Sequence, residues 1–172
     1  MAAIQNNIVI QNETDLRFAI PDVLVASGGV ATIQAGTPTK HADTAAGSWT
    51  GAVVPMVDGD GAVGQRFTGI AKSTSTDTAS AAGSVTLWLP LPGYVYACKA
   101  KTASTADTAA EVTALFGKRV VFDLTSSLWS VDAAAADALI NCVTIIGGDY
   151  LTQTLYFTYN TNGSLIGQFK TS

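Results

Sequence analysis

The sequence predicts a mainly β protein, a sandwich or barrel built from many short strands. From Val30 onward, short runs of β-favouring residues alternate with clusters of Gly, Ser, Thr, Asp and Pro, which is typical of closely spaced strands and turns. One run also shows the strand period of two, with Val85, Leu87 and Leu89 on one face and Thr86 and Trp88 on the other. At 172 residues the chain is long enough to bury a core without disulfides or a metal.

The N-terminal stretch differs from the rest, because it is rich in Asn and Gln and contains no glycine before Gly28. We interpret residues 1–20 as an extended arm and residues 21–172 as a single β-rich domain. The arm is too apolar to stay in water, so it either adds a strand to the sheet edge of a neighbouring subunit or partner, or forms the first strand of its own barrel. The candidate partner-binding residues are Ile4, Gln5, Asn6, Asn7, Ile8, Val9, Ile10 and Trp88.

Two hairpins are expected. Residues 90–93, Pro-Leu-Pro-Gly, end the strand that contains Trp88, because proline cannot donate to a central ladder. Residues 94–101 are the expected return strand. Residues 155–169 are the second expected hairpin, with Asn162 and Gly163 as its tight turn.

One short helix is predicted over about residues 105–116. Ser104 is the expected cap, with Asp107 three residues on, and Gly117 closes the helix. Its apolar stripe contains Val112, Leu115 and Phe116. A second helix candidate covers about residues 133–139.

A short word, Asp-Thr-Ala, begins at Asp43, Asp77 and Asp107. The first two copies lead through Ala-Ala-Gly-Ser into an expected strand, which suggests two related β units. The alternative is that a composition rich in Ala, Thr and Gly repeats short words by chance, since Asp-Thr favours turns.

Composition and charge narrow the classes of partner. Charged residues make up only 13% of the chain and the formal net charge is −4, so there is no basic stripe for nucleic acid. No apolar run reaches the roughly 18 residues of a membrane helix, and the start has no basic leader, so we expect a protein of a soluble compartment. Cys98 and Cys142 lie among strand-like neighbours and are expected to be buried free thiols.

No residues indicate catalysis, a metal or a cofactor. His41 is the only histidine, which excludes a multi-histidine site within one chain, and we interpret it as a surface-loop residue. Asp58 and Asp60 are spaced as in a calcium loop, but the remaining acidic positions of such a loop are missing. The glycines of residues 59–64 do not follow a phosphate-binding pattern.

Aromatic residues allow a different function. Five of them could line a sugar-binding surface or pack in the core: Trp49, Trp88, Trp129, Tyr94 and Tyr96. A carbohydrate-binding or adhesion module is therefore an alternative to a structural role, and a hydrolase using scattered carboxylates is a third.

Residues 52–102 resemble the central region of bacteriophage head decoration (capsid cement) proteins. The shared features are an apolar strand, a Gly/Asp turn, Ala-Val-Gly leading into Gly-Ile-Ala, a Ser/Thr/Ala loop, and a strand ending near a glycine. They lie at residues 53–57, 58–61, 62–64, 69–71, 73–83 and 85–93. The part from Asp107 to Ser172 is longer than the smallest members of such families would have.

The resemblance implies a small β-barrel or tulip-like fold without catalysis or cofactors. It also implies a structural virion protein, made in the host cytoplasm, that binds the outside of the capsid and stabilises the shell. The implied partners are the major capsid protein lattice and two further copies of the chain, as a homotrimer over local three-fold positions. In this interpretation Trp88 anchors either the core or a subunit contact.

Overall fold

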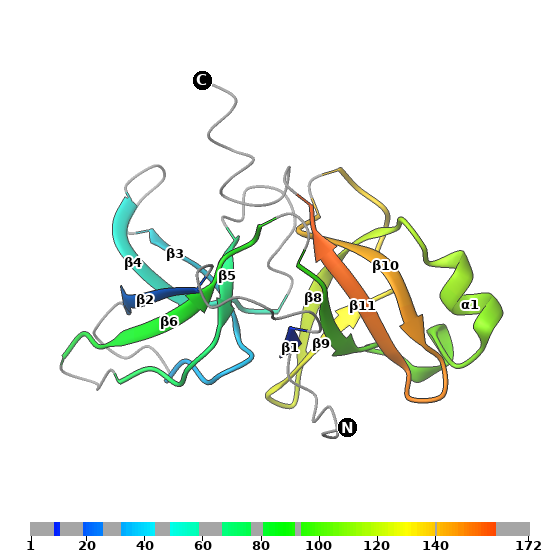
Figure 1. Cartoon of the computed structure of the whole chain (residues 1–172), viewed down its shortest axis with the longest axis horizontal. Helices are drawn as coiled ribbons and strands as arrows, with labels where there is room; N and C mark the ends of the chain where they lie inside the picture. Colours follow the sequence, from blue (N-terminus) through cyan, green and yellow to red (C-terminus); the bar gives the residue numbers. More distant parts are fainter. Residues whose placement is uncertain are drawn as a thin grey trace.

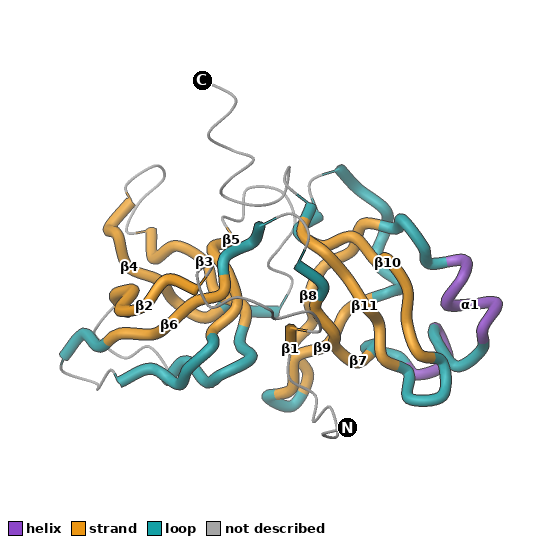
Figure 2. The backbone as a smooth tube through the Cα atoms, viewed as in Figure 1, coloured by secondary structure: helices purple, strands orange, loops and turns teal. Residues whose placement is uncertain are grey.

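A computed structural model describes residues 9–10, 19–25, 32–43, 49–58, 67–76, 81–91, 94–139 and 141–160. The chain forms two antiparallel sheets that lie side by side (Figure 1). Strands dominate the described residues, with one short helix at the outer side of one sheet (Figure 2). The prediction of a mainly β fold with one short helix is confirmed.

The first sheet has five strands, in the spatial order β2-β6-β5-β3-β4. Their bounds are β2 Ala19–Leu24, β3 Pro38–Asp43, β4 Trp49–Pro55, β5 Phe67–Ala71 and β6 Ser84–Trp88. In β6 the predicted alternation is confirmed, since Val85 and Leu87 are buried while Thr86 and Trp88 are half-buried; Leu89 lies beyond the strand and is half-buried.

The second sheet has six strands, in the order β1-β7-β11-β10-β8-β9. Their bounds are β1 Val9–Ile10, β7 Tyr96–Lys99, β8 Arg119–Thr125, β9 Leu128–Asp132, β10 Val143–Asp149 and β11 Thr154–Tyr159.

Both sheets curl so that a strand at or next to one edge meets the strand at the opposite edge, without closing into a barrel. In the first sheet an isolated parallel bridge joins Val25, just after β2, to Val53 of β4. In the second a parallel bridge joins Ala100, just after β7, to Val131 of β9. We call β2 to β6 the first unit and β7 to β11 the second unit. Both units have the same order when their strands are counted along the chain: first, fifth, fourth, second, third.

The repeated Asp-Thr-Ala word does not mark these units. Asp43 ends β3 and Asp107 precedes the helix of the second unit, so the two words occupy different places in the shared strand order. Asp77 lies outside the described residues. The first two copies precede β4 and β6, which both belong to the first unit, so the relationship between the units lies in their topology and not in this word.

The predicted hairpin around residues 90–93 is wrong. The strand before it, β6, already has β2 on one edge and β5 on the other. The expected return strand, β7, instead pairs with β1 and β11 of the second sheet. The proline-rich segment therefore connects the two units, and the Tyr96 hydroxyl donates a hydrogen bond across it to the Leu89 carbonyl (3.2 Å).

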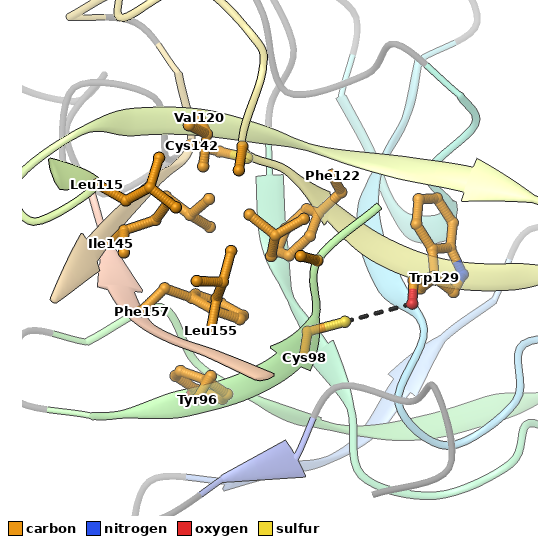
Figure 3. Packing of buried hydrophobic residues seen from close by; sticks show 14 of the residues in the cluster. Tyr96, Cys98, Leu115, Val120, Phe122, Trp129, Cys142, Ile145, Leu155 and Phe157 are labelled. Carbon is orange, nitrogen blue, oxygen red and sulfur yellow. Dashed lines mark hydrogen bonds between the residues drawn. The ribbon is translucent and has the colours of Figure 1, made fainter. Parts of the chain in front are cut away.

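The core consists of a large cluster in the second unit and a small one in the first. Phe122 and Phe157 pack edge to face with ring centroids 5.6 Å apart in the large cluster, among the residues drawn in Figure 3. Met56, Phe67 and Ile70 of the first half of the chain belong to this large cluster as well. The two sheets are therefore joined by a shared apolar core. The small cluster contains Val25, Ile33, Val53, Ala71, Val85 and Leu87.

The helix is shorter than predicted and begins at a different cap. Helix α1 covers Ala109–Ala114 and is preceded by a 3-10 turn at Ala103–Thr105. Its N-cap is Thr108: the hydroxyl accepts from the Glu111 amide, and Glu111 accepts in return from the Thr108 amide. Ser104 is not the cap, because it lies inside the 3-10 turn. Phe116 lies beyond the end of the helix and is 69% exposed, so it is not part of the buried stripe.

The second helix candidate, residues 133–139, is not a helix. The Asp132 carboxylate accepts hydrogen bonds from the amides of Ala134 and Ala135, which makes a turn. The Asn141 side chain then donates to the Ala136 carbonyl, which a helix would use for its own ladder. Side chains thus take over the backbone groups that would otherwise extend a helix.

The second half of the predicted C-terminal hairpin, residues 161–169, lies outside the described residues. Its first half is β11, which has β10 on one edge and β7 on the other.

Candidate functional site

The described residues of the predicted arm pair with their own chain: Val9 and Ile10 form β1, and the end of the arm, Ala19 and Ile20, belongs to β2. Strand β1 lies antiparallel to β7, with Val9 opposite Ala97 and Ile10 opposite Tyr96. For Val9 and Ile10 the interpretation as an internal strand is confirmed. Ile4, Gln5, Asn6, Asn7 and Ile8 lie outside the described residues, and their partner-binding role stays a prediction.

Trp88 ends β6, opposite Ala19 on one side and Ile70 on the other. Its ring is half-buried and packs against the large core cluster. The Lys72 ammonium lies over the ring, 5.5 Å from its centroid, in a cation–π arrangement. Trp88 therefore packs on the core of its own chain, and its role in a subunit contact stays a prediction.

The other aromatic residues that could line a sugar site are mostly internal. Tyr96 is fully buried and Trp129 is 6% exposed, so neither ring can lie against a bound sugar. Tyr94 packs partly buried on the same core, 6.2 Å from the Tyr96 ring. The side chain of Trp49 lies outside the described residues.

His41 is not a surface-loop residue. It lies in β3 opposite Val53 and is only 6% exposed. Its neighbours Lys40 and Ala42 alternate with it and are half-buried, which is the period of a strand whose one face is interior. The strand that contains His41, Pro38–Asp43, carries no strongly apolar residue, so no clear signal of a strand is present in the sequence at this position.

Asp58 lies at the junction of the two units. Its carboxylate accepts a hydrogen bond from the Leu124 amide of β8 at 3.4 Å, so it connects the end of β4 to the second unit. Asp60 lies outside the described residues. Within the described part of the chain, no group of three or more His, Cys, Asp or Glu side chains is placed to hold a metal ion.

Lys101, Asp123 and Asp132 form an ion-pair cluster in the second unit, which the sequence did not indicate. The Lys101 ammonium contacts the Asp123 carboxylate at 2.7 Å and the Asp132 carboxylate at 3.2 Å. The Lys101 amide also donates to the Val131 carbonyl. Since Lys101 follows the bridge residue Ala100, these contacts fasten the end of β7 to β8 and β9.

The electrostatics of this cluster favour the charged forms. Burial by itself would raise the pKa of Asp123, but hydrogen bonds from Lys101 and from Thr125 (2.7 Å) outweigh burial, and the pKa is lowered. The hydrogen bonds that the Lys101 ammonium donates to Asp123 and to Asp132 raise the pKa of Lys101. The cluster can therefore brace the fold, whereas a general acid or base would need a pKa near neutrality.

The two cysteines are buried free thiols, as predicted. Cys98 donates to the Trp129 carbonyl at 3.3 Å, drawn as the dashed line in Figure 3. Burial raises the pKa of Cys98 to about 12, so its thiol is not a nucleophile at neutral pH.

The exposed large apolar side chains of the described residues are Ile20, Leu24, Val57, Phe116, Leu128, Leu139, Tyr150 and Leu151. Two of them, Ile20 (43% exposed) and Leu24 (55%), lie on β2, a strand that is exposed along most of its length. The strand β2 is also at the edge of its sheet. Exposed apolar side chains on an edge strand are typical of a surface that contacts another chain.

Comparisons with protein-family models, with curated proteins and with solved structures found no match to this chain. Among the described helices, none is long and apolar enough to cross a membrane.

Proposed function

We propose that this chain is a structural virion protein that binds the outside of a phage capsid and stabilises the shell, without catalysis. The observation that carries the proposal is the resemblance of residues 52–102 to head decoration proteins. In the fold this stretch runs from β4 through the connection between the units into β7. It includes the residues through which the two units share a core.

The physical character of the chain fits such a role. Binding only to the assembled lattice stabilises that lattice by mass action, and many weak copies add together. The scarcity of charge leaves small polar and apolar surface for protein contacts, and an exposed apolar edge strand is available at β2. The proposed partners are the major capsid protein and two further copies of the chain in a homotrimer.

The direct test is to look for a major capsid gene near the gene of this chain, and to mix the purified chain with capsids assembled from the product of that gene. We expect saturable binding at local three-fold positions in a particle reconstruction and a higher temperature of capsid rupture. Absence of bound density at saturating protein, or isolated monomers at other positions, would contradict the proposal.

Two deletions test the arm as the contact. Removing residues 2–8 leaves β1 in place and should weaken capsid binding at least tenfold, which corresponds to about 1.4 kcal/mol, with little change in melting temperature. Removing residues 2–10 also uncovers β7 and should lower the melting temperature. Wild-type capsid affinity in the first deletion would rule the arm out.

The alternative function, carbohydrate binding, rests on Trp88 and Tyr94, which retain some exposure. A glycan array with the purified chain tests it. Saturable binding to one sugar class that is lost in Trp88→Ala would favour this alternative if the chain also shows no binding to capsids.

A further inference from the structure

The two units correspond in the register of their strands as well as in strand order. Where the first and fifth strands pair, Val23 lies opposite Val85 in the first unit and Cys98 lies opposite Leu155 in the second. The amide that follows the first strand also makes the same hydrogen bond in both units. Val25 donates to the Gly83 carbonyl and Ala100 donates to the Gln153 carbonyl, each acceptor lying just before the fifth strand.

The remaining pairings give the same correspondence independently. The pair Ala71 and Leu87 corresponds to Ile145 and Phe157. The pair Thr39 and Gly69 corresponds to Val120 and Val143. The two isolated bridges place Val53 where Val131 lies.

The buried residues follow this correspondence. Each strand or bridge residue of the small core cluster has a buried counterpart in the large one. The matched pairs are Val25 with Ala100, Val53 with Val131, Ala71 with Ile145, Val85 with Leu155 and Leu87 with Phe157. The chain is thus a tandem pair of one five-stranded unit.

One matched inner position holds a titratable residue in the first unit and an aromatic hydrocarbon in the second. His41 lies opposite Val53, as Phe122 lies opposite Val131. Directly opposite residues of an antiparallel pair share one face of the sheet, and Val53 belongs to the small core cluster. The His41 side chain therefore faces the interior of the first unit, and it is only 6% exposed.

The polar character of this interior extends along β3. Thr39, two residues before His41, is fully buried where the second unit has Val120. The Thr39 hydroxyl donates to the Gly69 carbonyl at 2.9 Å and shares a hydrogen bond with the Thr68 hydroxyl at 2.8 Å. The first unit thus closes its core with fewer apolar contacts at these positions than the second unit does.

The strands around His41 carry little charge. The two strands that flank β3, which are β4 and β5, contain no charged residue, and neither does β6. On β2 the one charged residue, Asp22, is exposed. Lys40 is the neighbour of His41 in β3, and successive residues of a strand point to opposite faces, so the Lys40 ammonium does not share the inner face.

Three more charged residues complete the described part of the first unit. The Asp58 carboxylate accepts from the Leu124 amide of the second unit. The Lys72 ammonium lies over the ring of Trp88, which packs against the large core cluster. Asp43 follows an irregularity in the pairing of β3 with β4, and its side chain lies outside the described residues.

We propose that His41 is a pH-sensitive switch, whose protonation opens the interior of the first unit while the second unit stays folded. Burial disfavours the charged form of a histidine, because the imidazolium loses its hydration. In the unfolded chain the imidazole takes up its proton near pH 6.5. The stability of the first unit is therefore complete above about pH 6.5 and is lost as the pH falls below that value.

The second unit lacks this dependence. The chain contains no other histidine. The buried carboxylate of the second unit, Asp123, is held in its charged form by Lys101 and Thr125, so it loses its proton at a lower pH than an ordinary aspartate. The two units consequently respond to acid in different pH ranges.

The test uses the full chain, in which His41 gives the only imidazole signal in an NMR titration. We expect a titration midpoint at least one pH unit below about 6.5, the ordinary value of histidine. The equilibrium constant for unfolding, measured in urea, should then rise about fivefold or more between about pH 7.5 and about pH 5.5.

Two variants assign this dependence to the imidazole. His41→Phe introduces the residue of the matched position, and His41→Gln introduces a polar side chain that does not titrate. Both should lose the rise in the unfolding constant over this pH range. Since His41→Phe adds apolar volume, His41→Gln keeps the test valid if the first variant folds poorly.

Amide hydrogen exchange, corrected for intrinsic rates, locates the opening. Protection of the amides in β3, β4 and β5 should fall about fivefold between the two pH values, whereas protection in β10 and β11 should not change. Three results would overturn the proposal. They are a midpoint at or above about pH 6.5, which would mean that a carboxylate such as Asp43 holds the charged form, a pH dependence that persists in both variants, and an equal loss of protection in the two units.

Discussion

The two units of this chain have one framework and two different interiors. At matched inner positions the first unit has Ala71, Leu87 and His41, where the second has Ile145, Phe157 and Phe122. The second unit therefore buries larger aromatic side chains, and the first has a smaller core with a polar group in it. Strand order and register therefore do not depend on one particular set of core side chains, or on one core volume.

The outer faces differ in the opposite sense. Ile70 of the first unit is fully buried, because its face packs against the second unit. Its counterpart Thr144 lies half-buried on the face of the second unit. The first unit thus places apolar side chains outside its own core to complete the core of its neighbour. We expect the second unit to determine the stability of the whole chain.

The largest expected effect comes from truncating matched core residues. Phe157→Ala should lower the free energy of unfolding by about 3–5 kcal/mol, since Phe157 is fully buried between Tyr96 and Phe122. Leu87→Ala at the matched position should cost about 2–3 kcal/mol, because the smaller core loses fewer contacts. Urea denaturation measures both. A larger loss for Leu87→Ala would contradict the ranking of the two units.

A smaller loss is expected where the two backbones differ. A Cβ on Gly69 would clash with the Trp88 carbonyl oxygen, whereas the matched residue of the second unit is Val143. Gly69→Ala should cost about 1–3 kcal/mol through this clash. Gly51→Ala is the control, because Gly51 also has positive φ but an added Cβ meets no atom within 4 Å. Equal losses in the two variants would mean that φ alone, and not the close approach, requires glycine.

The third prediction concerns the ion-pair cluster of the second unit. Asp123→Asn should cost about 1–2 kcal/mol at pH 7, because a hydrogen-bonded charge is lost while Lys101 keeps partial access to water. The pKa of Asp123 is lowered by folding, so its contribution is present above the unfolded pKa of about 3.9 and is lost as the pH falls through the folded value. The difference between variant and wild type should therefore shrink below about pH 4. A difference that stays constant down to pH 2 would exclude Asp123 as the titrating group.

The smallest effect is expected at the helix of the second unit, for which the first unit has no counterpart among the described residues. Thr108→Ala should cost about 1 kcal/mol, because the hydroxyl caps the Glu111 amide. Ser104→Ala should be close to neutral, since Ser104 lies in the preceding 3-10 turn. Thermal unfolding followed by circular dichroism compares them. A greater loss in Ser104→Ala would show that the helix begins earlier than Thr108.

Local patterns in the sequence determined the β class, the faces of β6 and the burial of both cysteines. Each depends on the strand period or on the apolar character of adjacent residues, which a chain carries wherever it folds. The helix was found for the same reason, although its cap was placed at Ser104 because two overlapping Ser/Thr patterns compete over residues 104–111.

Only the tertiary structure decided which strands pair. Residues 94–101 read as the return of β6, yet both edges of β6 are taken by β2 and β5, and Tyr96 is buried in the core of the other unit. The interior position of His41 and the cluster around Lys101 also arise from residues distant in sequence. The tandem units are hidden for the same physical reason: register is fixed by backbone pairing and by which positions face inward, and matched positions such as Ala71 and Ile145 need share only that they are buried.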